Sequence, residues 1–476
     1  MTLSFRGSGK VFYKDKELEC DLYLNENEGG ILFNIRVNEA IASYLTLPLD
    51  IEQLSGELSN GYKFTLINAS RTKTNSNIST QQSTFTYQAE YLLEGIGEDK
   101  ADNLLFDKMY FSIPGIMEWG GISGYKINKT DYSLISNEDT EEELYHDDNL
   151  SIRYMIHNSM LPISEFDLLT GRIILNQRSI IVIELFNGAH IESFISHFNQ
   201  LKRLIELSVL HELVPNKITG ISKNIVMNIG DAEYPREINI ISYKCRKEES
   251  EEATHRAKFN WIMMRELVNN QSFQHFFDRY NLLEPIVELY IELLHQTVTS
   301  HRRIFMNLVE ALETYHSRMV TNDKKSFISR VDALVHNLPE EWRDKDREFL
   351  LKNQKRYQNI LLRNRIADLL YAEDQYYFDT GDIEHNDFPQ VIADTRNFYI
   401  HYDERIKSRG RVLTEEELQI YNRCLFQILE FYILKELGFT DFNYIRNKLN
   451  MRWGNVSQDL LIQKQSDEMK SKKARD

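Results

Sequence analysis

The segment Thr395-Arg396-Asn397-Phe398-Tyr399-Ile400-His401-Tyr402 places an arginine and a histidine five positions apart among aromatic residues. The surrounding pattern predicts one helix that begins near Asn386 or Asp387, with Pro389 in its first turn, where proline is favoured. A guanidinium holds a phosphate through paired hydrogen bonds, and histidine side chains titrate near neutral pH. Cleavage of RNA without a metal needs this pair of groups, because RNA supplies its own nucleophile, the 2′-hydroxyl. No other segment of the 476 residues indicates a chemistry as directly.

The directions of these side chains complicate a site on a single helix. At about 100° per residue, one narrow polar stripe contains Gln390, Asp394, Asn397 and His401. Five residues turn a helix by about 500°, so Arg396 and His401 point about 140° apart. Both reach one phosphate only if the arginine wraps around, the helix distorts, or two copies of the motif meet across a symmetric interface. The alternative is a solvated helix face that ends in a histidine.

Length and composition describe an ordinary globular chain. The 476 residues predict two to four domains, and a hydrophobic content of 42% is enough for buried cores. With only 8 prolines and 20 glycines, long disordered or fibrous stretches are not expected. The net charge of −16 argues against a broad electrostatic surface for nucleic acid, so RNA would need a local basic or polar cleft.

The cysteines indicate the reducing interior of a cell, and the apolar runs indicate a protein that does not span a membrane. The three cysteines, Cys20, Cys245 and Cys424, are far apart, so neither a disulfide framework nor a cysteine zinc site is expected. The first residues lack the apolar segment of a signal peptide, and the longest apolar runs are too short to span a bilayer. We therefore expect a soluble, cytoplasmic protein with no membrane contact. No segment has the full spacing of a metal or cofactor motif, so no metal or other cofactor is expected.

Residues 1–245 predict a β-rich domain that is sandwich-like or an open barrel. Its short strand candidates, separated by turn clusters, include 10–13, 19–24, 31–37, 62–68, 83–93 and 104–113. One long helix is predicted near 190–212, where apolar residues recur at helical spacing. A hairpin is expected around a connection at 176–178. The acidic stretch 137–148 predicts a solvated loop, because adjacent carboxylates do not converge on one metal ion.

From about residue 255 onward the pattern becomes helical, and residues 255–455 are predicted to form an all-α domain. Its last long helix has a clear start, with Thr414 as N-cap and Glu417 three residues on. The helix is predicted to stop at Gly438. The remaining residues, 456–476, form a charged tail.

The motif at 395–401, in the penultimate long helix of this region, resembles the Arg-x4–6-His signature of the HEPN superfamily of ribonucleases. The residue after the arginine is commonly polar in that superfamily, and Asn397 fits. Residues 308–316 resemble an earlier helix of the ApeA-like branch, which joins a β-rich N-terminal domain to a HEPN domain. The resemblance therefore implies an α+β multidomain protein, with a β-rich sandwich-like domain followed by an all-α HEPN helical bundle.

The resemblance implies a homodimeric, metal-independent endoribonuclease of a bacterial antiphage system. RNA cleavage, with tRNA as the expected target, would stop growth of the infected cell. His401 would be the general base or acid, Arg396 would hold the scissile phosphate, and Asn397 would orient one of these groups. The supporting candidates are Asp394 and Tyr399 on the same helix, and Glu313 and His316 on an earlier one. The two residues of the earlier helix either line the cleft or have a structural role at the helix surface.

The β-rich domain carries no catalytic signature and is expected to act as a sensor of a phage-derived trigger or as a restraint. The alternative is a non-catalytic scaffold, with a helical dimerisation domain and a protein-binding β-domain. A third hypothesis is a nucleotide-binding, antitoxin-like helical module. A ribonuclease assay on the wild type and on Arg396→Ala separates the first hypothesis from the other two, and co-purified nucleotide would favour the third.

Overall fold

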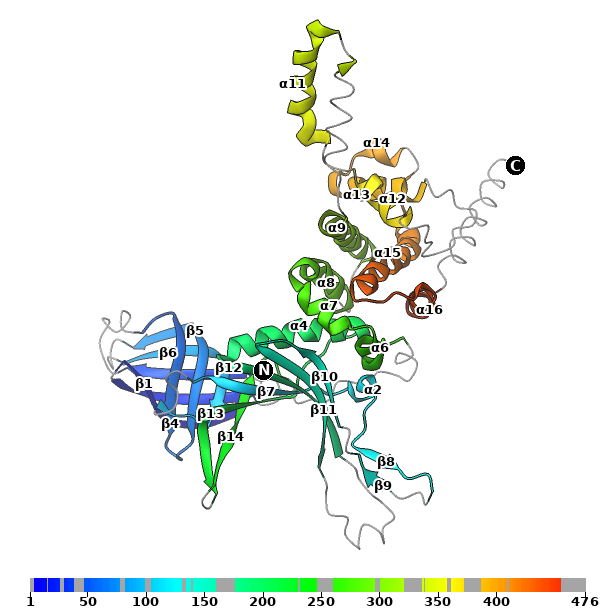
Figure 1. Ribbon diagram of the computed structural model, residues 1–476. Coiled ribbons are helices and arrows are strands. Elements are labelled where there is room, and N and C mark those ends of the chain that lie inside the picture. Colours follow the sequence, from blue (N-terminus) through cyan, green and yellow to red (C-terminus); the bar gives the residue numbers. More distant parts are fainter. Residues whose placement is uncertain are drawn as a thin grey trace. The chain divides into compact units, whose positions relative to one another are not determined.

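A computed structural model of the chain describes residues 4–14, 16–25, 30–37, 47–77, 82–98, 104–130, 134–137, 140–159, 176–229, 232–245, 260–295, 300–320, 336–337, 339–357, 361–371, 387–408 and 411–454. The chain divides into two compact units, a β unit, Met1–Asn269, and a helical unit, Asn270–Asp476 (Figure 1). This succession of a β-rich region and a helical region confirms the predicted fold class. The domain limits 1–245 and 255–455 stay predictions, and the predicted tail 456–476 lies outside the described residues.

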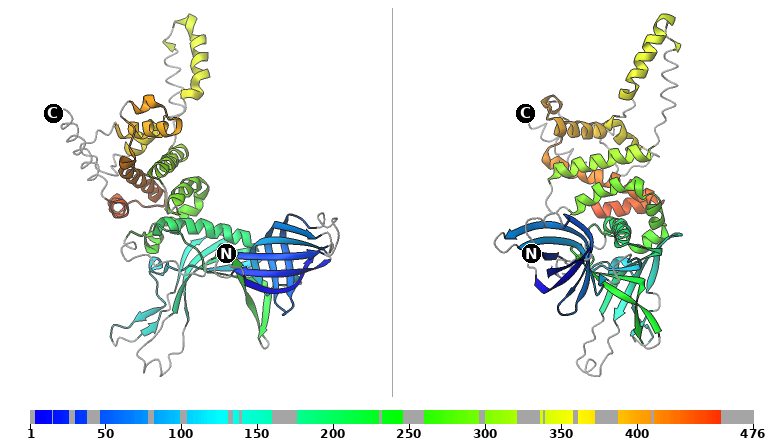
Figure 2. Two further views of the ribbon diagram at one scale, coloured as in Figure 1. Left: turned by 180° about the vertical axis from the view of Figure 1, so that it is seen from behind. Right: turned by 90° about the vertical axis from the view of Figure 1, so that its left-hand side faces the viewer.

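Six strands at the start of the β unit close into an antiparallel barrel, drawn in blue in Figure 2. They are β1 (Ser4–Tyr13), β2 (Lys16–Asn25), β3 (Gly30–Val37), β4 (Asp50–Leu58), β5 (Lys63–Asn77) and β6 (Gln82–Glu94). They pair in the order β6, β3, β2, β1, β4, β5, and β5 then pairs with β6 again. Closure gives each edge of this part of the sheet a hydrogen-bonded partner, which a sandwich does not provide.

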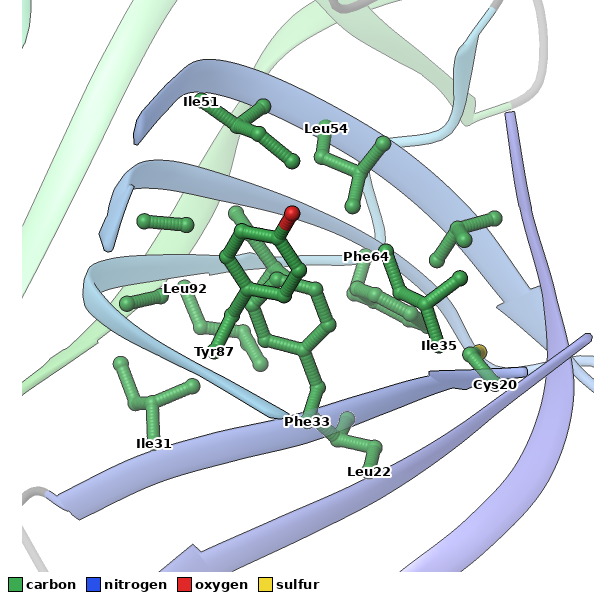
Figure 3. Close-up of a cluster of buried hydrophobic side chains, with 14 of the residues drawn as sticks. Cys20, Leu22, Ile31, Phe33, Ile35, Ile51, Leu54, Phe64, Tyr87 and Leu92 are labelled. Atoms are coloured by element: carbon green, nitrogen blue, oxygen red, sulfur yellow. The ribbon is translucent and has the colours of Figure 1, made fainter. Parts of the chain in front are cut away.

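Apolar side chains from alternate positions fill this barrel. On β3, Ile31, Phe33 and Ile35 are buried, whereas the residues between them are partly exposed. The Phe33 ring stacks on Tyr87 with centroids 5.2 Å apart (Figure 3). The Tyr87 hydroxyl donates a hydrogen bond to the Pro48 carbonyl at 2.7 Å. Each such buried side chain contributes about 1.5–3 kcal/mol, so the barrel core is a major source of stability in this unit.

The remaining long strands extend the sheet beyond β6. In order they are β14 (Ala232–Ser242), β13 (Lys217–Ile229), β7 (Phe106–Ser112), β12 (Asn176–Ala189), β11 (Leu150–Ser159) and β10 (Glu141–His146). Helix α4 (Ile191–Val209) packs on this extension, where the Phe198 ring stacks on Phe111 with centroids 4.1 Å apart. Smaller elements of the unit are α2 (Met117–Gly120), β8 (Tyr125–Ile127), β9 (Leu134–Ser136) and α6 (Met264–Asn269).

Two local predictions in the β unit are wrong. The predicted turn at 176–178 belongs to β12, where Arg178 pairs with His157 of β11. Its polar residues suggested a connection, but they lie on a partly exposed part of a strand. The acidic stretch contains β10 instead of being a loop throughout, and Glu141 forms an ion pair with Arg153 at 3.0 Å. Since β10 is the last strand of the sheet, its charges suit an exposed edge.

The helical unit is built around α15. Its helices are α7 (Ser272–Asp278), α8 (Tyr280–His295), α9 (His301–Met319), α11 (Glu340–Tyr357), α12 (Leu362–Tyr371), α13 (Asp387–His401), α14 (Glu404–Lys407), α15 (Glu415–Glu436) and α16 (Phe442–Trp453). The predicted capping box of Thr414 and Glu417 is confirmed, and Gly438 follows the helix with φ of 90°. Every residue of α15 from Cys424 to Leu434 is buried. In the described part of the chain, no helix is both long enough and apolar enough to cross a membrane.

Candidate functional site

Helix α13 carries the arginine and the histidine and is fixed by one buried face. It begins at Asp387, as predicted, and Ile392 is fully buried. Thr395 is also fully buried, and its hydroxyl accepts a hydrogen bond from the Leu413 amide at 3.1 Å. This bond links α13 to the segment that begins α15. Helix α13 also packs against α9 and α12, so the motif lies on a well-supported element (Figure 1).

Arg396 points toward α9. Its Nη2 lies 3.2 Å from Oε2 of Glu313, and the two side chains are 31% and 29% exposed. Its Nη1 lies 3.4 Å from Oδ1 of the neighbouring Asn397. Partly exposed ion pairs contribute only about 0–1 kcal/mol, because water screens them. A phosphate can therefore replace the Glu313 carboxylate at little cost.

The Arg396–Glu313 pair borders a cavity of about 470 Å³ between α9, α12 and α13. Two further arginines line the cavity, Arg318 from α9 and Arg365 from α12. A second carboxylate comes from Glu310. With three guanidinium groups and two carboxylates in its lining, the cavity carries a small net positive charge, which favours an anionic ligand.

His401 is the last residue of α13, and its side chain is exposed. The helix stops there because Tyr402 adopts a left-handed conformation with φ of 51°, and its amide donates to the Phe398 carbonyl at 2.6 Å. Arg302 of α9 covers this end, with its guanidinium 4.6 Å from the centroid of the Tyr399 ring and 4.9 Å from that of Tyr402. His401 is absent from the described lining of the cavity beside Arg396. Within one chain, the two groups therefore face different surroundings.

The other supporting candidates make structural contacts, within α13 in the case of Asp394 and to other segments in the cases of Tyr399 and His316. Asp394 is buried and accepts a hydrogen bond from Gln390 at 2.9 Å. The Tyr399 hydroxyl donates to the Leu413 carbonyl at 3.1 Å, and burial raises its pKa, so it stays protonated. His316 is fully buried, with Nε2 2.9 Å from a carboxylate oxygen of Asp368. Of the earlier-helix candidates, Glu313 lines the cavity, whereas His316 is not among its lining residues.

Three arginines near the motif were missed by sequence reasoning, namely Arg302, Arg318 and Arg365. Arg365 directly precedes the buried Ile366 on α12, and a basic residue beside an apolar one usually lies on a solvated face of its helix. Only the packing of α12 against α9 turns it toward Glu313, whose backbone carbonyl accepts a hydrogen bond from Arg365 Nη1 at 3.2 Å.

Among the described residues, no three histidine, cysteine, aspartate or glutamate side chains form a group that could hold a metal ion. The described side chains at the candidate site are guanidinium groups, carboxylates, an amide and an imidazole.

Comparison with known families links both units to one kind of protein. The model of the ApeA N-terminal domain 1 matches residues 5–280. The model of the Apea-like HEPN matches residues 306–442, a range that includes Glu313, Arg396 and His401. No curated protein and no solved structure matches the chain.

Proposed function

This chain belongs to the ApeA-like HEPN family, and on that premise we propose that it is a metal-independent endoribonuclease. Membership of the family indicates an antiphage HEPN nuclease. The proposal rests mainly on Arg396, which lines a cavity with two other arginines and forms a partly exposed ion pair with Glu313. His401, exposed at the end of the same helix, is available to move protons.

The proposed reaction uses the nucleophile that RNA already carries. An incoming phosphate replaces the Glu313 carboxylate at Arg396, whose guanidinium then stabilises the charge that grows on the phosphoryl oxygens. His401 accepts the proton of the 2′-hydroxyl as the 2′-oxygen bonds to phosphorus, or donates a proton to the departing 5′-oxygen. Asn397, 3.4 Å from Arg396, orients the guanidinium. The products are a 2′,3′-cyclic phosphate and a 5′-hydroxyl.

A second copy of the chain completes the proposed site. Arg396 and His401 point about 140° apart on a regular helix, and only Arg396 lines the cavity. In a twofold-symmetric dimer, each arginine can face the histidine of the other copy, and two identical sites result. The proposed homodimer therefore forms through the helical unit.

The charge distribution supports RNA binding at the helical unit. Residues 1–269 contain 26 basic and 39 acidic residues, whereas residues 270–476 contain 30 and 33, so most of the excess acid belongs to the β unit. The acidic β unit is the proposed receptor for a phage-derived trigger. The proposed RNA target is tRNA, whose cleavage would halt translation in the infected cell.

Cleavage is expected to need the 2′-hydroxyl and no divalent metal. Purified protein should cut an RNA oligonucleotide equally well, within about twofold, in magnesium and in excess EDTA. One 2′-deoxy substitution at the mapped cleavage position should block that cut, and the all-DNA oligonucleotide should stay intact. Gel analysis of end-labelled oligonucleotides measures both effects. Strict dependence on magnesium would contradict the mechanism, and no cleavage under any condition would favour the scaffold alternative.

Removing the charge of Glu313 should strengthen RNA binding. Glu313→Gln keeps the size of the side chain but no longer competes with phosphate for Arg396, so we expect up to about fivefold tighter binding, the equivalent of the pair's ~1 kcal/mol. Fluorescence anisotropy with a 2′-O-methyl RNA, which cannot be cleaved, measures this change. Glu348→Gln, at an exposed position of α11, is the control for a general change in charge. Weaker binding by Glu313→Gln would mean that the carboxylate positions Arg396 instead of competing for it.

A further inference from the structure

We infer that Arg365 and Arg318 form a second phosphate subsite beside Arg396, which holds the RNA backbone next to the cleaved bond. This inference rests on the proposed nuclease function and adds positioning residues to it. The three arginines come from α12, α9 and α13, and they line one cavity of about 470 Å³. A cavity of this size falls within the range that binds small ligands.

The hydrogen bonding of Arg365 suits a role in phosphate binding. Its Nη1 donates a hydrogen bond to the backbone carbonyl of Glu313 at 3.2 Å, which holds the guanidinium at the wall of the cavity. A guanidinium has five N–H donors, so it can keep this bond and also bind a phosphate. Glu313 contacts Arg396 through its side chain and Arg365 through its carbonyl, so the two guanidinium groups lie beside the same residue of α9.

The cavity has a polar end and an apolar end along α9. Twelve residues separate Met306 from Arg318, which corresponds to about 18 Å of helix. Met306 and Ile400 form the apolar end, and Ile400 directly precedes His401. Ser317 and Arg318 lie at the other end of this stretch. A nucleotide fits this arrangement if its base contacts the apolar end and its phosphate binds Arg365.

Salt dependence of binding provides the test, because each phosphate contact to single-stranded RNA contributes about 0.7 to the slope of log K against log salt concentration. Full-length protein carrying His401→Ala leaves the RNA intact during titration. In that background, Arg365→Ala should reduce the slope by about 0.7 and weaken binding about fivefold at 0.1 M salt. Arg365→Lys should restore the slope, since it restores the charge. Arg363→Ala, two residues away on α12 and bonded to Gln390, should leave both quantities unchanged.

Each outcome of this titration decides the inference. An unchanged slope in folded Arg365→Ala would overturn the subsite, and so would equal losses in Arg365→Lys and Arg365→Ala, which would indicate a structural bond to α9. If Arg365→Ala weakens the binding of AMP, measured by calorimetric titration, but leaves the RNA slope unchanged, the cavity binds a free nucleotide and the assignment to RNA is overturned. Wild-type protein that binds RNA without cleaving it would refute the nuclease function separately, because the slopes are measured without cleavage.

Discussion

Protein carrying His401→Ala should cleave RNA at least about 10²–10⁴-fold more slowly than the wild type, because it lacks the proton carrier of the proposed reaction. The side chain is exposed, so the free energy of unfolding should change by less than about 0.5 kcal/mol. Single-turnover cleavage of a labelled RNA and a urea unfolding curve measure the two quantities. Arg396→Ala should lose activity to a similar extent, and Arg396→Lys should recover little of it, since lysine lacks the paired donors. Full activity of His401→Ala would remove the catalytic assignment.

Mixing the two inactive variants tests whether the site spans two chains. If each site takes Arg396 from one copy and His401 from the other, a mixed dimer of Arg396→Ala and His401→Ala keeps one complete site of two. Random exchange makes half of the dimers mixed, so roughly one quarter of wild-type activity should return. Neither variant alone should show it. If each site lay within one chain, every site of the mixture would lack one group and no activity would return.

The fold class was predictable because apolar residues recur with one dominant spacing in each region, that of strands in the first and that of helices in the second. Alternating β-rich runs such as 31–37 predict strands, and apolar residues at helical spacing, among them Leu308 and Leu312, predict α9. The start of α15 was also readable, since the capping box of Thr414 is a local interaction. Closure of the barrel could not be predicted from the sequence. It requires β6 to pair with both β3 and β5, the two ends of the row of strands, and this pairing has no local signature. The edge strand β10 was missed because its glutamates make the segment look like a solvated loop. Charged residues suit a strand at the exposed edge of a sheet, but the sequence alone does not show that this segment lies at an edge.

The candidate site was only partly predictable for a similar reason. The sequence predicted that Arg396 and His401 lie on one helix and that their side chains point in different directions. The second prediction follows from helical geometry alone. The pairing of Arg396 with Glu313 depends on how α13 packs on α9, 83 residues earlier in the chain. Arg365 reaches the same cavity through a third helix. Contacts between separate helices have no local signature, so only the assembled structure reveals this cluster of guanidinium groups.

Glu430→Ala should destabilise the helical unit by about 3–5 kcal/mol, because it breaks a buried ion pair. Glu430 of α15 and Arg452 of α16 form an ion pair whose side chains are both fully buried. Glu430 also accepts hydrogen bonds from the Tyr290 hydroxyl at 3.0 Å and from Trp453 Nε1 at 2.5 Å. Burial raises the pKa of Tyr290 to about 12, so this hydroxyl remains a donor. Without the carboxylate, three donors lose their acceptor, and one of them is a buried cation.

A double substitution separates two contributions to the free energy of unfolding: the cost of burying Arg452 without the Glu430 carboxylate, and the stabilisation that the ion pair itself provides. Glu430→Met with Arg452→Met removes both charges, and apolar side chains of similar length can fill their space, so this variant should be more stable than Glu430→Ala. Glu404→Gln, at an exposed position of α14, is the control and should leave stability within about 0.5 kcal/mol of the wild type. Urea unfolding followed by circular dichroism at the helical signal measures all three. A loss below about 1 kcal/mol in Glu430→Ala would mean that water reaches Arg452 and that α16 is not held by this pair. Since Tyr290 belongs to α8, the same bonds connect α8, α15 and α16. Helix α9, which carries Glu313, packs against α8 and α15, and α13, which carries Arg396, packs against α9.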